Sequence, residues 1–452
     1  MSELPNGWTA VQLGEITRDC QQQVPGSDRE FYYVDISAID RDTKIIVNPQ
    51  RMTGRDAPSR ARKLIRSGDV LVSMTRPNLN AVALVPDELN DQIASTGFDV
   101  LRSISVEPRW VFNNVRTRAF IEQMTNLVQG ALYPAVRSKD IRGYVIPIAP
   151  INEQKRIADK LDSLLARVDT CRERLDRVPG ILKRFRQAVL AAATNGELTR
   201  EWRGESKEHL PEQTPRTWSR CLTKEAGRIQ LGRQRSPKYH SGSNMRPYLR
   251  VQNIFEDRID LSDVMEMDFP GEDFERYKLH PGDILLNEGQ SPEFLGRPAL
   301  YNGELPDACF TNTLIRFQAH EFVSPNFALL VFRHYMHAGR FSSEGTITTN
   351  IAHLGAGRFG NIEFPLPSLA EQAEIVRRAT ILLSFADHCE NEVKRGRSAA
   401  DRLTPSLLSK AFRGELVPQD PNDEPASELL ARIRAAGTEQ PMVKRGRKAG
   451  AR

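Results

Sequence analysis

Two stretches of this sequence gather the side chains that contact nucleic acids. Residues 41–80 and 233–297 are rich in arginine and interrupted by glycine and proline. Arginine can donate two hydrogen bonds to a guanine edge, asparagine or glutamine can pair with adenine, and lysine or arginine neutralises phosphates. The candidate DNA-binding residues are Arg41, Lys44, Arg51, Arg55, Arg60, Arg62, Arg76 and Asn78 in the first stretch and Arg233, Arg235, Lys238, Tyr239, Gln290 and Arg297 in the second.

A solvated loop charge is the competing interpretation of each of these residues. For any single arginine it is the simpler one, because most surface charges have no partner. Each cluster taken as a whole favours contact with an anionic partner. The formal net charge of +5 permits such a partner without requiring one.

The sequence carries no motif for catalysis or cofactor binding. There is no GxxxxGK[ST] phosphate loop, no Asn/Asp-Pro-Pro-aromatic motif for amino methylation and no HExxH among the eight histidines. The five cysteines are scattered without a CxxC, which argues against a zinc site and against a disulfide framework. We expect no catalytic residue, no metal and no cofactor bound by this chain. The stretch GAGRFG, residues 355–360, is formally a GxGxxG, but it follows no clear strand and is interpreted as a glycine-rich turn.

The sequence also indicates where the protein resides. No apolar run approaches the 18 residues of a membrane-spanning helix, and the start lacks the pattern of a secretory signal. Unclustered cysteines are typical of a reducing compartment. We therefore expect a cytoplasmic protein.

An internal repeat organises the chain. Residues 147–169 and 365–387 share prolines, a Glu-Gln pair and a long apolar-periodic run at an offset of 218 positions. Gly68-Asp69 recurs as Gly282-Asp283 at an offset of 214, and Tyr33 recurs as Tyr248 at an offset of 215. Small drifts in the offset indicate loop insertions in one ancestral unit that has been duplicated.

The second part of each unit has the apolar spacing of a coiled coil. Apolar residues recur at alternating intervals of four and three, and two such strips in one chain can bury each other. The expected seam residues are Ile157, Leu161, Leu164, Val168 and Leu175 in the first copy and Ile375, Leu382, Val393 and Leu403 in the second. Pro179 and Pro405 fall within these stretches. Because the apolar phase continues across Pro179, a kink is favoured there over a helical hairpin.

The first part of each unit mixes short β-type runs with glycine, proline and asparagine, which is typical of an α+β domain. The predicted fold class is α+β, with two pseudo-symmetric globular domains joined by two long helices that form an antiparallel coiled coil. The expected parts are a globular domain over 1–150, a central helical spacer over 151–205, a second globular domain over 206–367, a C-terminal helical spacer over 368–436 and a disordered basic tail over 437–452.

Several motifs in combination resemble the specificity subunit of type I restriction-modification systems. They include LPNGW near the start, GDVLVSMTRPN, a proline followed by Glu-Gln-x-x-Ile at the head of each long helix, and AVLAAATNGELTREWR. The closing FRGELVPQDPNDEPASELLARIRA extends the resemblance to about residue 436.

The resemblance implies two target recognition domains, each of which reads one half of a split DNA site. It implies helical spacers that dock two methyltransferase subunits, to which endonuclease/translocase subunits add in phage defence. The chain would then be non-catalytic, while the partner subunits methylate adenine at N6 and bind S-adenosylmethionine, ATP and Mg²⁺. Glu153, Gln154, Glu371 and Gln372 would head the spacer helices, where they complement the helix dipole and need no separate function. The alternative is a non-enzymatic coiled-coil scaffold whose globular ends bind proteins.

Overall fold

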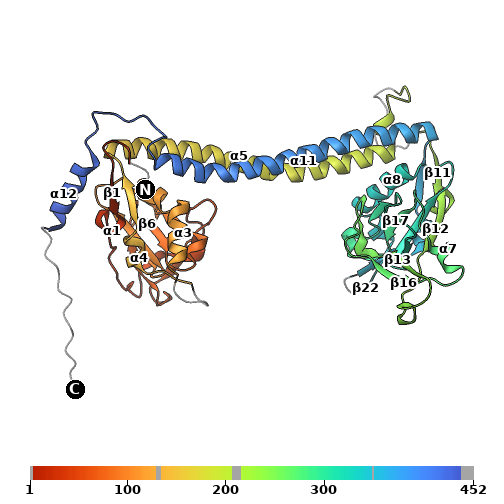
Figure 1. Ribbon diagram of the computed structural model, residues 1–452, viewed down its shortest axis with the longest axis horizontal. Helices are drawn as coiled ribbons and strands as arrows, with labels where there is room; N and C mark the ends of the chain where they lie inside the picture. The colour runs from red at the N-terminus through yellow and green to blue at the C-terminus, as the bar shows by residue number, and fades with distance from the viewer. Residues whose placement is uncertain (1–3, 129–133, 206–214, 349–350, 439–452) are drawn as a thin grey trace, which may run out of the picture. The chain divides into compact units, whose positions relative to one another are not determined.

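The computed structural model describes residues 4–128, 134–205, 215–348 and 351–438. The chain forms two compact units, of which unit 1 combines Met1–Asp176 with Arg395–Arg452 and unit 2 is Arg177–Lys394. Each unit contains one globular module and part of each of two long helices (Figure 1). We call residues 4–150 module 1 and residues 215–367 module 2.

Module 1 contains a strand pair and two four-stranded sheets. The pair is β1 (Thr9–Gln12) and β10 (Val145–Ile148). One four-stranded sheet has the order β2 (Thr17–Arg18), β9 (Phe98–Ser103), β6 (Val70–Ser73), β7 (Val82–Leu84). The other has the order β4 (Gln50–Thr53), β3 (Glu30–Val34), β8 (Gln92–Ser95), β5 (Ala61–Ile65). The helices of the module are α1 (Leu13–Ile16), α2 (Pro108–Asn114), α3 (Arg118–Asn126) and α4 (Ser138–Arg142).

Module 2 repeats this plan. The pair is β11 (Ser219–Leu222) and β24 (Glu363–Leu366), one sheet runs β12 (Gly227–Leu231), β21 (Leu314–Ala319), β17 (Ile284–Asn287), β19 (Pro298–Leu300), and another runs β16 (Met265–Asp268), β13 (Met245–Leu249), β20 (Cys309–Phe310). Smaller sheets join β14 (Ile254–Phe255) to β15 (Arg258–Ile259) and β18 (Gly289–Gln290) to β23 (Ile351–His353) and β22 (Thr346–Thr348). The helices are α6 (Thr223–Ala226), α7 (Asp273–Tyr277), α8 (Pro325–His337), α9 (Arg340–Glu344) and α10 (Ala356–Gly360).

The duplication seen in the sequence is a duplication of topology. The sheet order β2-β9-β6-β7 of module 1 is repeated as β12-β21-β17-β19 in module 2. The terminal ladders have the same register, since Thr9 opposes Ile148 in one and Ser219 opposes Leu366 in the other. These matches confirm the α+β class and the two pseudo-symmetric modules.

The GAGRFG stretch differs from its expected form. It follows the short strand β23, and most of it forms the five-residue helix α10, with Gly355 at a φ of 66°. This helix is the counterpart of α4 in module 1, which has no glycine-rich loop. The structure therefore makes it a short helix that recurs in both modules, where the sequence predicts a glycine-rich turn.

The long helices are α5 (Ile151–Asn195) and α11 (Leu369–Ala411), which lie side by side in Figure 1. Pro179 and Pro405 lie inside continuous helices, which excludes the helical hairpin. In unit 1, Arg172 pairs with Asp401 at 3.3 Å and Asp176 pairs with Arg397. The residue numbers rise along one helix as they fall along the other, so the two helices run antiparallel, as predicted.

The buried strip of the long helices only partly follows the predicted seam. Ile157, Leu161, Val168 and Ile375 are buried, whereas Leu164, Leu175, Leu382 and Val393 are partly buried. Leu165, which the sequence analysis did not select, is 8% exposed and belongs to the core of module 1. The end of α5 near module 1 packs on that core as well as on α11, and intervals of four, four and three residues keep its buried side chains on one face of a straight helix.

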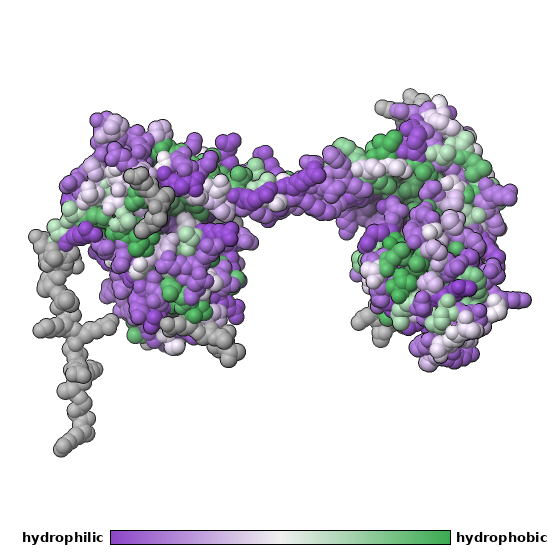
Figure 2. All heavy atoms as spheres, viewed as in Figure 1, coloured by the Kyte–Doolittle hydropathy of each residue, from purple (hydrophilic) through white to green (hydrophobic). Residues whose placement is uncertain are grey.

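Leu403 is 47% exposed, so its assignment to the buried seam is wrong. At this level the helices meet through polar contacts instead. Arg172 donates from Nη2 to the backbone oxygen of Ala400 at 3.2 Å, and Ala400 takes the buried position. The exposed sides of the two helices are mainly hydrophilic in Figure 2.

The C-terminal helix α12 (Ala426–Thr438) completes module 1. Its buried residues Leu429, Leu430 and Ile433 join the hydrophobic core that contains Trp8. The backbone N–H of Ala426 donates to the oxygen of Gly7 at 2.9 Å. The helix thus continues two residues into the predicted basic tail, whose remainder, 439–452, lies outside the described residues.

Within the described ranges, α5, α11 and every other helix are too short or too polar to cross a membrane.

Candidate nucleic-acid interface

One loop surface of module 1 brings together four of the predicted DNA-binding residues. The loop between β6 and β7 carries Arg76 and Asn78, which are both exposed. Lys44 Nζ donates to the backbone oxygen of Asn80 in this loop at 2.6 Å, and Arg41 lies one turn before Lys44. We call Arg41, Lys44, Arg76 and Asn78 loop surface 1.

The backbone of loop surface 1 is held in an unusual conformation. Lys44, Arg76 and Asn80 have φ values of 61°, 48° and 45°, a region that residues other than glycine rarely occupy. Two hydrogen bonds fix the loop, from Asn80 Nδ2 to the oxygen of Val115 and from Arg76 N to the oxygen of Pro134, both at 2.8 Å. Strained backbone of this kind is common at binding sites, where the surrounding fold imposes it.

Positive charge is concentrated beside loop surface 1. Burial lowers the pKa of Lys44 to about 8, and the neighbouring charge of Arg116 adds to the effect, while Asp42 and Asp40 oppose it. Burial also lowers the pKa of Arg116 to about 10. These shifts show cations that nearby carboxylates only partly offset, so an anionic ligand would stabilise them. Arg116 lies outside the arginine-rich stretch, so no sequence pattern singles it out.

The remaining predicted residues of module 1 lie on β4 (Arg51), on β5 (Arg62) and in the connection between these strands (Arg55 and Arg60). Arg51 forms an exposed ion pair with Glu30 at 2.5 Å, and Arg55 forms one with Asp28 at 3.4 Å. Arg60 is exposed, while the partly buried Arg62 donates to the backbone oxygen of Ala61. Exposed pairs are worth at most about 1 kcal/mol, so Arg51 and Arg55 can exchange their carboxylates for phosphates at little cost.

Arg233 of module 2 is a core residue, which corrects its assignment as a surface reader. It is 5% exposed, and its guanidinium lies 3.7 Å from the ring centroid of Tyr239 and 2.9 Å from Asp273. Tyr239 is thereby used as a stacking partner. Arg235 and Lys238 are exposed as predicted, with the Lys238 ammonium 4.7 Å from the Tyr239 ring.

Gln290 and Arg297 lie in the connection between β17 and β19, which we call loop surface 2 (residues 288–297). This connection is the counterpart of the β6–β7 loop of module 1. Gln290 belongs to β18 and pairs with Ala352, and the guanidinium of Arg297 contacts the rings of Phe255 and Phe294. The structure therefore places predicted residues of both modules on topologically equivalent loops.

The Glu-Gln pairs do more than complement the helix dipole. Gln154 donates to the oxygen of Ala149 at 2.7 Å and accepts from the backbone N–H of Glu107 at 3.1 Å. Gln372 donates to Pro367 and Phe322 oxygens and accepts from the Ser324 backbone at 2.7 Å. Each glutamine is fully buried and ties the start of a long helix to the loop that precedes α2 or α8. The partners before α2 and α8 are backbone groups about 50 residues away in sequence, which is why no local pattern reveals this role.

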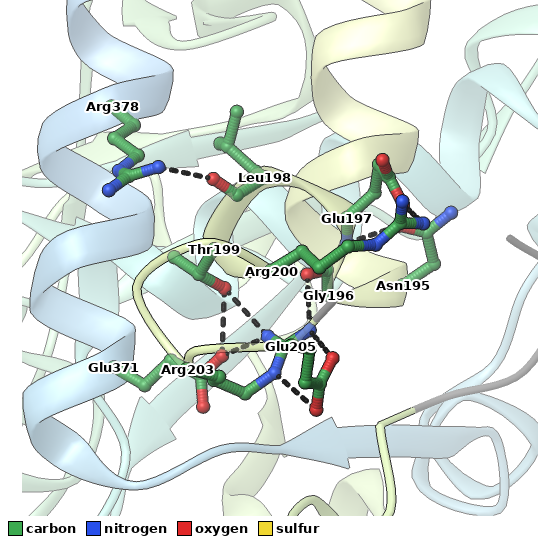
Figure 3. A network of polar contacts seen from close by, with 10 residues as sticks. All are labelled: Asn195, Gly196, Glu197, Leu198, Thr199, Arg200, Arg203, Glu205, Glu371 and Arg378. Carbon is green, nitrogen blue, oxygen red and sulfur yellow. Dashed lines mark hydrogen bonds and ion pairs between the residues drawn. The ribbon is translucent and has the colours of Figure 1, made fainter. Parts of the chain in front are cut away.

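A polar network closes the start of α11 in unit 2 (Figure 3). Thr199 Oγ1 donates to Glu371 Oε1 at 2.7 Å, and Arg203 forms an ion pair with the same carboxylate. Arg203 also donates to the oxygen of Gly196, and Arg378 donates to the oxygen of Leu198 at 3.1 Å. The NGELTREWR segment after α5 is thus fastened over the first turns of α11.

Unit 1 has the corresponding closure with different partners. The indole N–H of Trp8 donates to Glu153 Oε2 at 3.0 Å, and Arg156 pairs with Asp423 at 2.6 Å. Burial raises the pKa of Glu153, and the hydrogen bond from Trp8 opposes this shift. The repeated NGEL and RGEL motifs therefore mark segments that dock on the first turn of the other long helix.

Known proteins share this sequence and architecture. Residues 41–179 match the family model described as type I restriction modification DNA specificity domain. The chain is 30% identical over 330 residues to the EcoKI specificity subunit of Escherichia coli K12, which covers 71% of this chain and 70% of that protein. The chain belongs to the specificity subunits of type I restriction enzymes. A 30% identity to the Escherichia coli EcoDI specificity subunit covers 70% of this specificity subunit and 74% of the relative.

Solved structures agree with this membership. The HsdS subunit from Thermoanaerobacter tengcongensis superposes with a TM-score of 0.63 at 26% identity, over 91% of this chain and 98% of that one. A chain solved in work on the complex assembly and conformational transition of a type I R-M system gives a TM-score of 0.73 at 28% identity, over 92% and 100% of the two chains. The two modules are DNA target recognition domains, and the protein-binding scaffold is not supported.

Over the ranges that the structure describes, no three His, Cys, Asp or Glu side chains gather to hold a metal ion.

Proposed function

We propose that this specificity subunit reads a bipartite duplex site, with one module for each half, as the non-catalytic part of an adenine-N6 methyltransferase and type I restriction endonuclease. One observation carries the proposal: the two modules share a scaffold but differ in the side chains that equivalent loops present. Module 1 presents Arg76 and Asn78, whereas module 2 presents Gln290 and Arg297. Two different readers on one repeated scaffold suit a site with two unlike halves.

We also propose two methyltransferase subunits as partners, with endonuclease/translocase subunits added to them. Repeated helices offer repeated docking surfaces, and family membership supports this assignment. On α11, Ile381 and Phe385 are 56% and 59% exposed and lie one turn apart, as a helix face awaiting a partner would. S-adenosylmethionine, ATP and Mg²⁺ would be bound by the partners in the cytoplasm, and none of them by this chain.

The test is a module exchange in the reconstituted complex. Residues 1–150 are replaced by the corresponding module of another specificity subunit, and methylated adenines are mapped on genomic DNA. We expect one half of the methylated motif to change while the other stays. A motif that changes in both halves, or in neither, would contradict the proposal.

A second experiment tests the spacer role of α5 and α11. Inserting one helical turn, about 5.4 Å, at opposing positions of both helices should widen the gap between the half-sites by one or two base pairs. The mapped motif reports the gap directly. An unchanged gap in an active complex would show that the helices do not set the spacing.

A further inference from the structure

We propose that Arg297 of module 2 recognises a guanine, with its guanidinium held in position by the rings of Phe255 and Phe294. The inference rests on the proposed DNA-reading function and assigns a base to one position of one half-site. Arg297 ends loop surface 2 and lies directly before β19. It is therefore fixed at the edge of a sheet, where a rigid scaffold holds it.

Two aromatic rings fix the orientation of the Arg297 guanidinium. Its central carbon is 4.7 Å from the centroid of Phe255 on β14 and 5.4 Å from the centroid of Phe294. A guanidinium that stacks on aromatic faces uses its flat surface for cation–π contact and keeps its N–H edge for hydrogen bonding. A fixed planar edge is what bidentate donation to guanine O6 and N7 requires.

Arg297 lacks the carboxylate that neighbouring arginines have. Arg333 binds Glu256 at 2.9 Å and Asp257 at 2.8 Å, and Arg316 pairs with Asp283 at 3.5 Å. In the described part of the chain, the Arg297 side chain forms neither a hydrogen bond nor an ion pair, and its Nε is buried without a partner. Burial lowers the pKa of Arg297. The charge of Glu256 opposes this shift and the charge of Arg258 adds to it, so the compensation is incomplete. A half-buried, unpaired guanidinium is costly unless a ligand supplies acceptors.

Asn287 lies opposite Arg297, and its side chain has no hydrogen-bond partner among the described residues. Asn287 N donates to the oxygen of Arg297 at 3.2 Å, and Gly296 N donates to the oxygen of Asn287 at 3.0 Å. These bonds extend the β17–β19 ladder, so the side chains of Asn287 and Arg297 lie on the same face. Asn287 is fully buried, yet neither Oδ1 nor Nδ2 has a partner among the described residues. Buried amides are nearly always hydrogen-bonded, so the Asn287 amide is an unsatisfied polar group next to Arg297.

The comparison with module 1 favours a base over a phosphate. Ala81 precedes β7 as Arg297 precedes β19, so module 1 has no arginine at the equivalent position. Phosphate contacts position a protein without reading sequence, and both half-sites offer the same phosphates. A reader present in only one module suits a feature present in only one half-site, which is a base.

The test compares variants of the reconstituted methyltransferase complex on a randomised DNA library. Arg297→Lys keeps the charge and removes the fork. We expect it to reduce the preference for guanine at one position of the module 2 half-site at least about fivefold, with all other positions unchanged. Phe294→Leu, at a ring that is 46% exposed, should relax the same position more weakly. The matched control is Arg258→Lys, because Arg258 stacks on the same Phe255 ring at 4.6 Å but also lies 3.7 Å from Asp260. It should leave the motif unchanged.

The outcomes separate this inference from the proposed function. Equal weakening of methylation at every site by Arg297→Lys, with the motif intact, would identify a phosphate contact and overturn the assignment. Full activity with an intact motif would overturn it as well. If the Arg297→Lys variant does not fold, the motif that the Phe294→Leu variant methylates is judged by the same criteria. A wild-type complex that methylates no bipartite site would instead refute the proposed function itself.

Discussion

The two target recognition domains share their sheets and differ in their charges. Arg116 of module 1 lies just after the end of α2, and Arg333 of module 2 lies within α8 at the equivalent position. Arg333 is neutralised by Glu256 and Asp257, whereas Arg116 lies beside Lys44 and forms no ion pair with the described residues. Module 1 thus holds two partly buried cations that carboxylates only partly offset, where module 2 has an internal ion-pair network. One set of residues stabilises the shared fold, and another set forms the surface that would contact DNA. The DNA-contacting residues can therefore diverge while the fold is kept.

The contacts at the starts of the two long helices likewise combine repeated residues with diverged ones. Glu371 is bound by the cation Arg203 and by Thr199, whereas Glu153 is bound by the neutral indole of Trp8. Gln154 and Gln372, by contrast, have matching partners in both units. The glutamine therefore belongs to the repeated scaffold, and the glutamate has been accommodated differently in each copy.

The largest expected effect follows from breaking the buried pair of unit 2. Arg203→Met leaves Glu371, which is 3% exposed, without its cation, and should destabilise unit 2 by about 3–5 kcal/mol. Hydrogen exchange of backbone amides at the start of α11 measures this loss of stability. Arg200→Met is the control, since its partner Glu197 has a side chain that is 40% exposed, and it should cost under about 1 kcal/mol. Equal losses for the two variants would contradict the assignment.

The glutamines should matter equally in both units. Gln154→Ala and Gln372→Ala each leave buried backbone groups without partners and should cost roughly 2–4 kcal/mol in their own unit. Hydrogen exchange resolved by unit separates the two losses. If only one variant loses stability, the glutamine is not part of the common scaffold.

The helix strip can be tested with two leucines. Leu165→Ala removes a buried side chain from the module 1 core and should cost roughly 2–3 kcal/mol. Leu403→Ala, at an exposed position, should change the free energy of unfolding by less than about 0.5 kcal/mol. Thermal unfolding compares them, and a reversed order would restore the originally predicted seam.

The smallest effect concerns the charge of Lys44. With a pKa of about 8, Lys44 loses its proton as pH rises from 7 to 9, so DNA affinity of module 1 should fall severalfold over this range. Lys44→Arg stays charged and should remove the pH dependence. Filter binding at constant salt measures both proteins. Because the unfolded state binds more protons between about pH 8 and 10.5, the stability of unit 1 should rise over that window.

Local patterns predict the repeat, the fold class and the long helices because each depends on periodic or repeated residues. They fail where distant residues decide. Arg233 looks like a loop charge beside Arg235, but Phe269 and Asp273 draw it into the core. The seam is displaced at Leu165 because module 1 covers that face of α5. No sequence pattern shows which arginine finds a carboxylate and which, like Arg297, does not.

The docking of α12 on module 1 has a consequence for synthesis on the ribosome. Unit 2 is one uninterrupted segment, whereas unit 1 combines a segment up to Asp176 with a segment that begins at Arg395. The nascent chain can therefore complete unit 2 while the core around Trp8 still waits for Leu429 and Leu430. A messenger RNA truncated before α12 would yield a protein with a folded unit 2 and with exposed apolar residues in the core of module 1. Cellular proteases and chaperones can recognise such exposed residues.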